Sequence, residues 1–172
     1  MIESVIHIVR SLPKEAVTML IATLPISELR GAIPWALAAP PVGGGLSWQT
    51  AYLYAVIGNF LPVIPLLLLL EPVSNVLRKT RAGDAFFTWL FERTRKKSAV
   101  IQRYEALGLI LFVGIPLPVT GAWTGTVAAF IFGIKLRYAI PCIILGILIA
   151  GVVVTLASLG VISFIGIVGS GA

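Results

Sequence analysis

Three long stretches of the chain contain no charged residue: 31–70, 106–134 and 138–172. Each meets or exceeds the roughly 20 residues that a helix needs to cross the hydrocarbon core of a bilayer. Composition agrees, because 58% of the residues are hydrophobic and only 12% are charged. Soluble domains have about 45–50% apolar and about 25% charged residues. The sequence therefore predicts an all-α integral membrane protein.

Most of the positive charge lies in one block. The formal net charge is +6, and eight of the 13 lysines and arginines lie between Arg78 and Arg103. A basic block between hydrophobic segments is typical of a cytoplasmic loop that contacts anionic lipid headgroups. We therefore expect a multi-pass protein of the cell (cytoplasmic) membrane, with the basic segment 78–103 in the cytoplasm and no nucleic acid as a partner.

The residues needed for metal binding or catalysis are missing from the sequence. Cys142 is the single cysteine and His7 the single histidine, so neither a CxxC motif nor a Cys/His cluster can form. Ser27 lies in an apolar region with no histidine or lysine near it in the sequence. We expect no metal, no cofactor and no enzymatic activity.

The same order of segments occurs in both halves of the chain: an amphipathic surface helix, a proline-broken apolar segment and a hydrophobic helix. We predict a single membrane domain, 1–172, composed of repeat 1 (1–71), a basic cytoplasmic linker with a surface helix (72–106) and repeat 2 (107–172). The expected elements are a surface helix 2–12, a broken segment 16–39, a turn 40–49, a helix 51–70 that Glu71 and Pro72 end, a surface segment 84–104, a broken segment 107–132 and a helix from 138 to about 168.

The positive charges indicate how the broken segments meet the membrane. If 107–132 crossed the bilayer, Lys135 and Arg137 would lie on the opposite side from the basic block. A segment that enters and returns keeps all of these cations on the cytoplasmic side, as the positive-inside rule favours. By the same reasoning 16–39 enters from the outer side. We therefore predict two inverted repeats, each with a re-entrant helical hairpin; four simple spans are the alternative.

Glu28 and Arg30 are the unusual residues of the first hairpin. Arms of about eight to ten residues rise about 12–15 Å, half of a roughly 30 Å core. The tip then falls near the membrane midplane, where charges cost several kcal/mol unless paired or hydrated. Because residues two apart on a helix face different ways, we expect an extended tip in which both charges share one site. Arg30 would hold an anionic group and Glu28 would gain and lose a proton; a structural ion pair is the alternative.

The second hairpin tip supplies hydroxyl groups and free carbonyls rather than charge, and its glycines allow close backbone approach. In helix 51–70, Gly58 and Asn59 precede Pro62 and Pro65, which indicates a kink facing the same cavity. The candidate residues for substrate binding and proton coupling are Glu28, Arg30, Pro25, Gly31, Pro34, Asn59, Pro116, Pro118, Thr120, Gly121, Thr124 and Gly125.

Two motifs carry a family resemblance: PISELRGAIP at 25–34 and GIPLPVTGAWTG at 114–125. Together they resemble the small multidrug export protein family, a distant relative of the DedA (VTT-domain) superfamily, over about 17–160. The resemblance implies two re-entrant hairpins in inverted repeat. DedA relatives are associated with the proton motive force and with moving lipids such as undecaprenyl phosphate across the bilayer. The second hairpin departs from the DedA pattern, which has an arginine after the glycine.

We therefore expect a secondary transporter or flippase, proton-coupled, for an amphipathic substrate with an anionic headgroup of the polyprenyl phosphate or phospholipid type. The alternatives are a small multidrug exporter of lipophilic cations and a non-transporting membrane scaffold. Arg30 favours the first, because a cation site would not hold a permanent positive charge beside its carboxylate. The expected partners are the lipid bilayer with its anionic lipids, the substrate and a second copy of the chain. Small residues on the last helix predict this homodimer: Gly146, Ala150, Gly151, Gly166 and Ser170.

Overall fold

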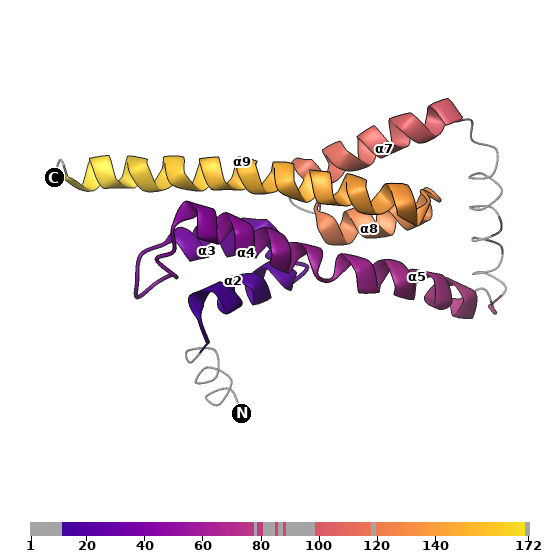
Figure 1. The fold of residues 1–172 in the computed structure, drawn as a ribbon, viewed down its shortest axis with the longest axis horizontal. Helices are drawn as coiled ribbons and strands as arrows, with labels where there is room; N and C mark the ends of the chain where they lie inside the picture. Colours follow the sequence, from indigo (N-terminus) through magenta and orange to yellow (C-terminus); the bar gives the residue numbers. More distant parts are fainter. Residues whose placement is uncertain are drawn as a thin grey trace. The chain divides into compact units, whose positions relative to one another are not determined.

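The computed structural model describes residues 12–77, 79, 80, 85, 88, 99–117 and 120–170, and this part of the chain is helical, without a strand (Figure 1). The predicted all-α class is confirmed. The expected surface helix 2–12 and most of the surface segment 84–104 lie outside the described residues. The helices are α2 (Lys14–Thr23), α3 (Glu28–Leu37), α4 (Trp48–Phe60), α5 (Val63–Leu77), α7 (Ala99–Gly114), α8 (Ala122–Ile131) and α9 (Leu136–Ser170).

Two helical stretches are long and apolar enough to cross a membrane, Trp48–Ser74 and Leu136–Ser163, with mean hydropathies of 2.2 and 2.8. Large apolar side chains along both remain exposed, among them Leu53, Leu68 and Leu156. Such a surface is unfavourable in water but suits contact with lipid. These two stretches agree with the hydrophobic helices predicted from the sequence and are candidate membrane spans.

The first of these stretches is interrupted, and its end differs from the prediction. Helix α4 stops at Phe60, Leu61 and Pro62 form a turn, and α5 continues to Leu77. The predicted end at Glu71 and Pro72 is wrong, since α5 contains both residues. Pro65 lies in the first turn of α5, where a missing N–H removes no helical hydrogen bond. The prolines therefore start a new helix instead of bending a continuous one.

The fold divides into two compact units: residues 1–59 together with 150–172, and residues 60–149. We describe each by itself. The units group the residues differently from repeats 1–71 and 107–172, so the inverted-repeat organisation stays a prediction.

In the unit 60–149, α7, α8 and the first half of α9 pack around one valine. Val113 of α7 is 1% exposed. A side chain at Gly125 of α8 would overlap its Cγ2 atom, and one at Gly146 of α9 would lie 2.6 Å from its Cβ atom. Glycine at both positions thus lets the two helices close on α7. The shape of this core depends on the absence of two side chains.

We expect Gly125→Ala to lower the free energy of unfolding by about 1–3 kcal/mol, because overpacking in a closed core forces neighbours to move. Val113→Ala removes the atom that clashes, so the double variant should lose less stability than the sum of the two single variants. Denaturant titration in mixed micelles measures this. Gly108→Ala on α7 is the matched control, since an added Cβ there meets nothing within 4 Å. Strictly additive losses would contradict the described packing.

Three of the small residues of α9 pack against other parts of the same chain. Gly146 faces Val113, and an added Cβ at Gly151 would lie 2.7 Å from the ring of Tyr52. Ala150 is buried. These three positions therefore offer no open surface to a second copy. The predicted homodimer is untested and would have to use another face.

The loop after α3 folds back onto that helix and fixes its end. The backbone N–H groups of Gly44, Gly45 and Leu46 donate to the carbonyls of Trp35, Ala38 and Ala36, at 2.9, 2.8 and 2.8 Å. These bonds satisfy carbonyls at the C-terminal end of the helix that would otherwise have no partner. Ser47 then caps α4, because its hydroxyl oxygen accepts the Thr50 N–H at 3.3 Å. The loop thereby fixes the C-terminal end of α3 and the start of α4.

Candidate functional site

The first hairpin consists of α2 and α3, two helices of ten residues that pack against each other across a short turn (Figure 1). Helix α2 ends at Thr23 because Leu24 precedes Pro25 and adopts an extended conformation, with ψ of 135°. Within the turn, the Ser27 hydroxyl donates to the Ile21 carbonyl. Ile26 at the apex is 92% exposed. Pro25 therefore shapes the turn, and the apolar side chain of Ile26 forms its tip.

Glu28 begins α3 in an unusual backbone conformation. Its φ is +45°, and among the described residues no other non-glycine residue has a positive φ. Its N–H donates to the Leu24 carbonyl at 3.0 Å, and the residue is only 5% exposed. A left-handed conformation in a residue with a side chain costs of order 1–3 kcal/mol and is concentrated at functional sites. The structure keeps a carboxylate buried at a position that glycine would occupy more easily.

Glu28 shares the buried face of α3 with apolar residues. The buried positions of this helix are Glu28, Leu29, Ala32, Ile33 and Ala36, and their spacing follows one side of an α-helix. The carboxyl group therefore enters the packed interior of its unit instead of facing open space. Its side chain interacts with neighbours in the chain.

Helix α3 includes both Glu28 and Arg30, so these residues are not in an extended segment as predicted. Because Glu28 has φ of +45°, regular helical spacing does not give the direction of its side chain relative to that of Arg30. Arg30 is only partly buried and also interacts within the chain. That Glu28 and Arg30 share one site stays a prediction.

Pro34 and Gly31 act on the backbone of α3. Pro34 lies inside the helix instead of ending it. Because proline has no N–H, the Arg30 carbonyl lacks its usual helical donor. Gly31 permits the close turn, since a side chain there would lie 2.7 Å from the Ser27 Cβ atom. The Arg30 carbonyl, which lacks its usual helical donor, and the Arg30 side chain thus lie in the same short stretch of α3.

Asn59 is another buried polar residue of this unit. It lies near the end of α4 and is 1% exposed. Its Oδ1 atom has no hydrogen-bond partner among the residues that the structure describes. The preceding Gly58 packs directly on the Met19 backbone of α2, and Thr23 Oγ1 lies 2.9 Å from the Gly58 carbonyl. Gly58 thus allows α4 to pack closely against α2. The buried Asn59 Oδ1 atom has no structural role among the described residues, which makes it a candidate for a functional contact.

We expect Asn59→Leu to leave the free energy of unfolding unchanged or higher, because it removes a buried acceptor that lacks a partner while keeping the volume similar. If Asn59 serves transport, the transport rate should fall in the same variant. Denaturant titration and a flux assay in proteoliposomes measure the two effects. A loss of stability above about 2 kcal/mol would instead make Asn59 a structural residue.

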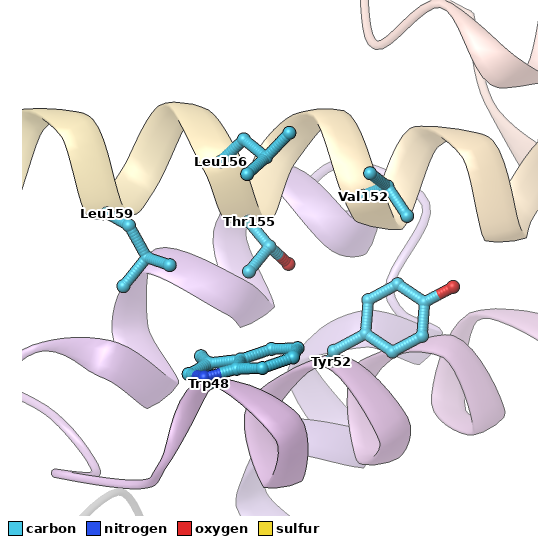
Figure 2. A pocket seen from close by; sticks show the side chains of 6 residues that line it. All are labelled: Trp48, Tyr52, Val152, Thr155, Leu156 and Leu159. Carbon is cyan, nitrogen blue, oxygen red and sulfur yellow. The ribbon is translucent and has the colours of Figure 1, made fainter.

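An apolar cavity of about 440 Å³ lies between α4 and the second half of α9. Figure 2 shows Thr155 and Leu159 projecting from α9 toward the rings of Trp48 and Tyr52. The Thr155 hydroxyl donates to the Gly151 carbonyl at 2.7 Å, so the lining presents little free polarity. This cavity was not predicted from the sequence, although two aromatic residues four positions apart on an apolar helix indicate a common face. The cavity suits a hydrocarbon chain.

The second tip belongs to the other unit, and its hydroxyl groups are used locally. Thr120 Oγ1 lies 2.7 Å from the Ile115 carbonyl and 3.0 Å from the Leu117 carbonyl, and it accepts the Leu117 N–H at 3.1 Å. Thr124 lies 3.4 Å from the Gly121 carbonyl. These hydrogen bonds stabilise the loop, so a substrate could accept a hydrogen bond from either threonine only by replacing a backbone carbonyl.

The remaining candidates of this tip have conformational or packing roles. Gly121 precedes α8 with φ of +150°, a conformation that favours glycine. Gly125 packs on Val113, as described above. Pro116 is partly buried in the irregular segment after α7, and Pro118 lies outside the described residues. Among the described residues no group of three or more His, Cys, Asp or Glu side chains could hold a metal ion.

Comparison with protein families gives a match over most of the chain. The family model described as "Putative small multi-drug export protein" matches residues 28–153, which begin at the start of α3 and include the second tip. The chain belongs to this family. Comparison with curated proteins and with solved structures gives no match. Membership in the small multi-drug export family agrees with the two apolar spans and indicates a transporter. The match begins at Glu28, so the strained carboxylate and Arg30 both lie within it.

Proposed function

We propose that the protein is a secondary transporter in which Glu28 couples proton movement to the export of an amphipathic substrate with an anionic headgroup. The observation that carries this proposal is the buried carboxylate at φ +45°. Neither its burial nor its backbone conformation favours stability, since both cost free energy. A group that gains and loses a proton explains why glutamate occupies this position.

Arg30 is the proposed contact for the headgroup. A guanidinium offers a planar fork of donors that matches phosphate and carboxylate. Its partial exposure leaves part of the guanidinium-bearing side chain reachable. In this scheme the headgroup binds at Arg30 and the proton at Glu28, two residues apart in α3, and a small movement of α3 would link them. The apolar cavity beside Trp48 and Tyr52, in the same unit, would accept part of the substrate's hydrocarbon chain.

We infer that α2 and α3 form a re-entrant hairpin. Ten residues rise about 15 Å, half of a roughly 30 Å core, and each helix has ten residues. The hairpin tip would then lie near the midplane, where the exposed Ile26 suits lipid. An inverted second hairpin from α7 and α8 and a distant relationship to the DedA superfamily belong to the same proposal.

Single cysteines in a Cys142→Ala background test this topology. We expect cysteines at Val42, which is 79% exposed, and at Lys79 to react with a membrane-impermeant maleimide from opposite sides. A cysteine at the exposed Lys135 should react from the same side as Lys79. If Lys135 reacts from the side of Val42, the second apolar segment crosses the bilayer and the inverted-repeat topology is wrong.

Export of lipophilic cations is the second candidate, and the family's description favours it. Both candidates use Glu28 as the proton carrier, but they differ in the role of Arg30. An anionic headgroup needs this guanidinium, whereas a cation would be repelled by it. A scaffold without transport, the third reading, requires neither charge.

Proteoliposomes with an imposed pH gradient test the proposed function. A polyprenyl phosphate, an anionic phospholipid and a lipophilic cationic dye are offered in parallel to the full chain. We expect gradient-dependent movement of one of the anionic lipids and no gradient-dependent movement of the dye. Movement of the dye alone would favour the second candidate, and movement of none would contradict the assignment as a proton-coupled transporter.

A further inference from the structure

Helices α2 and α4 touch through their backbones near their C-terminal ends. A Cβ atom at Gly58 would lie 2.4 Å from the Met19 carbonyl oxygen and 2.7 Å from the Met19 Cα atom. Helix α2 ends at Thr23 and α4 ends at Phe60, so both contact residues lie close to the last turn of their helix. The end of α2, which leads into the turn of the first hairpin, is thus packed directly on α4.

A hydroxyl group links the two helices at this contact. Thr23 Oγ1 lies 2.9 Å from the Met19 carbonyl oxygen of its own helix and 2.9 Å from the Gly58 carbonyl oxygen of α4. The Met19 carbonyl can also accept the N–H of residue 23, as in any α-helix. The Gly58 carbonyl would take its helical hydrogen bond from residue 62, but this residue is Pro62, which has no N–H. The Thr23 hydroxyl therefore supplies a donor that the backbone after α4 cannot supply.

Thr23 is also the last helical residue before the turn that leads to Glu28. Leu24 follows it in an extended conformation, and the Leu24 carbonyl accepts the Glu28 N–H at 3.0 Å. A left-handed conformation such as that of Glu28 persists only where the surrounding structure holds it. An anchor at the start of this short turn therefore acts on the backbone of Glu28.

We propose that Thr23 is a positioning residue for the proton-coupling site. Its hydrogen bond to the Gly58 carbonyl holds the first hairpin on α4 and thereby keeps Glu28 in its strained conformation. This role rests on the proposed function of Glu28 as the proton carrier. Satisfying the Gly58 carbonyl contributes stability, whereas attaching the hairpin contributes position, and only the second effect requires a donor from α2.

Substitutions of Thr23 test this role in proteoliposomes with the full chain. Thr23→Val keeps a similar shape but removes the donor. We expect the gradient-dependent maximal flux of the preferred anionic lipid to fall about tenfold, with KM unchanged because Arg30 is untouched. Thr23→Ser keeps a hydroxyl group and should retain most of the flux. Thr18→Val is the matched control and should transport as the original chain does, since the buried Thr18 hydroxyl donates to the Lys14 carbonyl within α2 at 2.8 Å.

The double variant Thr23→Val, Pro62→Ala separates position from stability. Alanine restores an N–H at position 62 that can donate to the Gly58 carbonyl, so the free energy of unfolding should recover relative to Thr23→Val. The flux should stay low relative to Pro62→Ala alone, because the restored donor does not come from α2. If the flux recovers together with the stability, Thr23 has only a structural role and the proposal is wrong.

Amide hydrogen exchange of residues 24–30 in nanodiscs gives a second readout, which needs no transport. Exchange should be about tenfold faster in Thr23→Val and in the double variant, but not in Thr18→Val, because loss of the anchor lets the tip open locally. Unchanged exchange in a folded Thr23→Val variant would overturn the role of Thr23; if that variant does not fold, the double variant decides in its place. An original chain that moves no lipid would contradict the proposed function of Glu28 instead, and exchange would still decide whether Thr23 holds the hairpin.

Discussion

Glu28→Gln is expected to abolish the dependence of transport on an imposed pH gradient while the protein stays folded. Glutamine has nearly the same size and fits the same buried face of α3, but it cannot take up or release a proton. Because Glu28 interacts within the chain and glutamine keeps a hydrogen-bonding side chain, the loss of unfolding free energy should stay below the roughly 3–5 kcal/mol of a broken buried ion pair. Gradient-driven flux in proteoliposomes and denaturant titration in mixed micelles measure the two quantities.

Two further substitutions at this position separate coupling from stability. Glycine adopts φ of +45° without strain, whereas alanine does not. Glu28→Gly should therefore be more stable than Glu28→Ala by roughly 1 kcal/mol, and neither should respond to the pH gradient. A Glu28→Gly variant that still transports with full gradient dependence would exclude Glu28 as the proton carrier.

Arg30→Ala should have the second large effect, a loss of affinity for the anionic substrate of about tenfold to hundredfold. This range corresponds to the roughly 1.5–3 kcal/mol of a hydrogen bond to a charged group. Arg30→Lys should recover part of the affinity, because an ammonium keeps the charge but not the planar fork of donors. Equilibrium binding of a short-chain polyprenyl phosphate to the protein in nanodiscs measures both variants.

The stability of the Arg30 variants distinguishes a substrate site from a structural ion pair. Arg30 is only partly buried and lies off the packed face of α3. Its removal should therefore cost less than the roughly 3–5 kcal/mol expected when a buried ion pair is broken. A loss of that size, with substrate affinity unchanged, would make the arginine a structural residue.

The sequence was sufficient to predict the helical membrane class and the first hairpin. Uncharged stretches of membrane length predict helices wherever they occur, and Pro25 predicts the extended Leu24 that ends α2. Short arms of about ten residues also follow from the positions of Pro25 and the glycine-rich turn. These features depend on residues that are close together in the chain, so a single sequence is enough to predict them.

Other features depend on contacts that the sequence does not display. The prolines suggested an extended tip, but the Glu28 N–H bonds to Leu24 and α3 starts at that residue. This hydrogen bond, together with close packing at Gly31, outweighs the strain at Glu28. In the same way, Gly146 and Gly151 fit a motif for pairing between chains, yet they receive Val113 and Tyr52 of the same chain. Spacing identifies a small-residue face but not the neighbour that occupies it.

The most direct test of the proposed transport site is gradient-driven flux of the preferred anionic lipid in the Glu28→Gln, Arg30→Ala double variant. The control variant is Gly160→Leu on α9, because an added Cβ at Gly160 meets nothing within 4 Å. This control should transport normally. We predict a double variant that folds, as judged by thermal unfolding in detergent, and moves no lipid in response to the gradient. A folded double variant with normal gradient-dependent flux would show that neither charge serves transport and that the substrate path lies elsewhere.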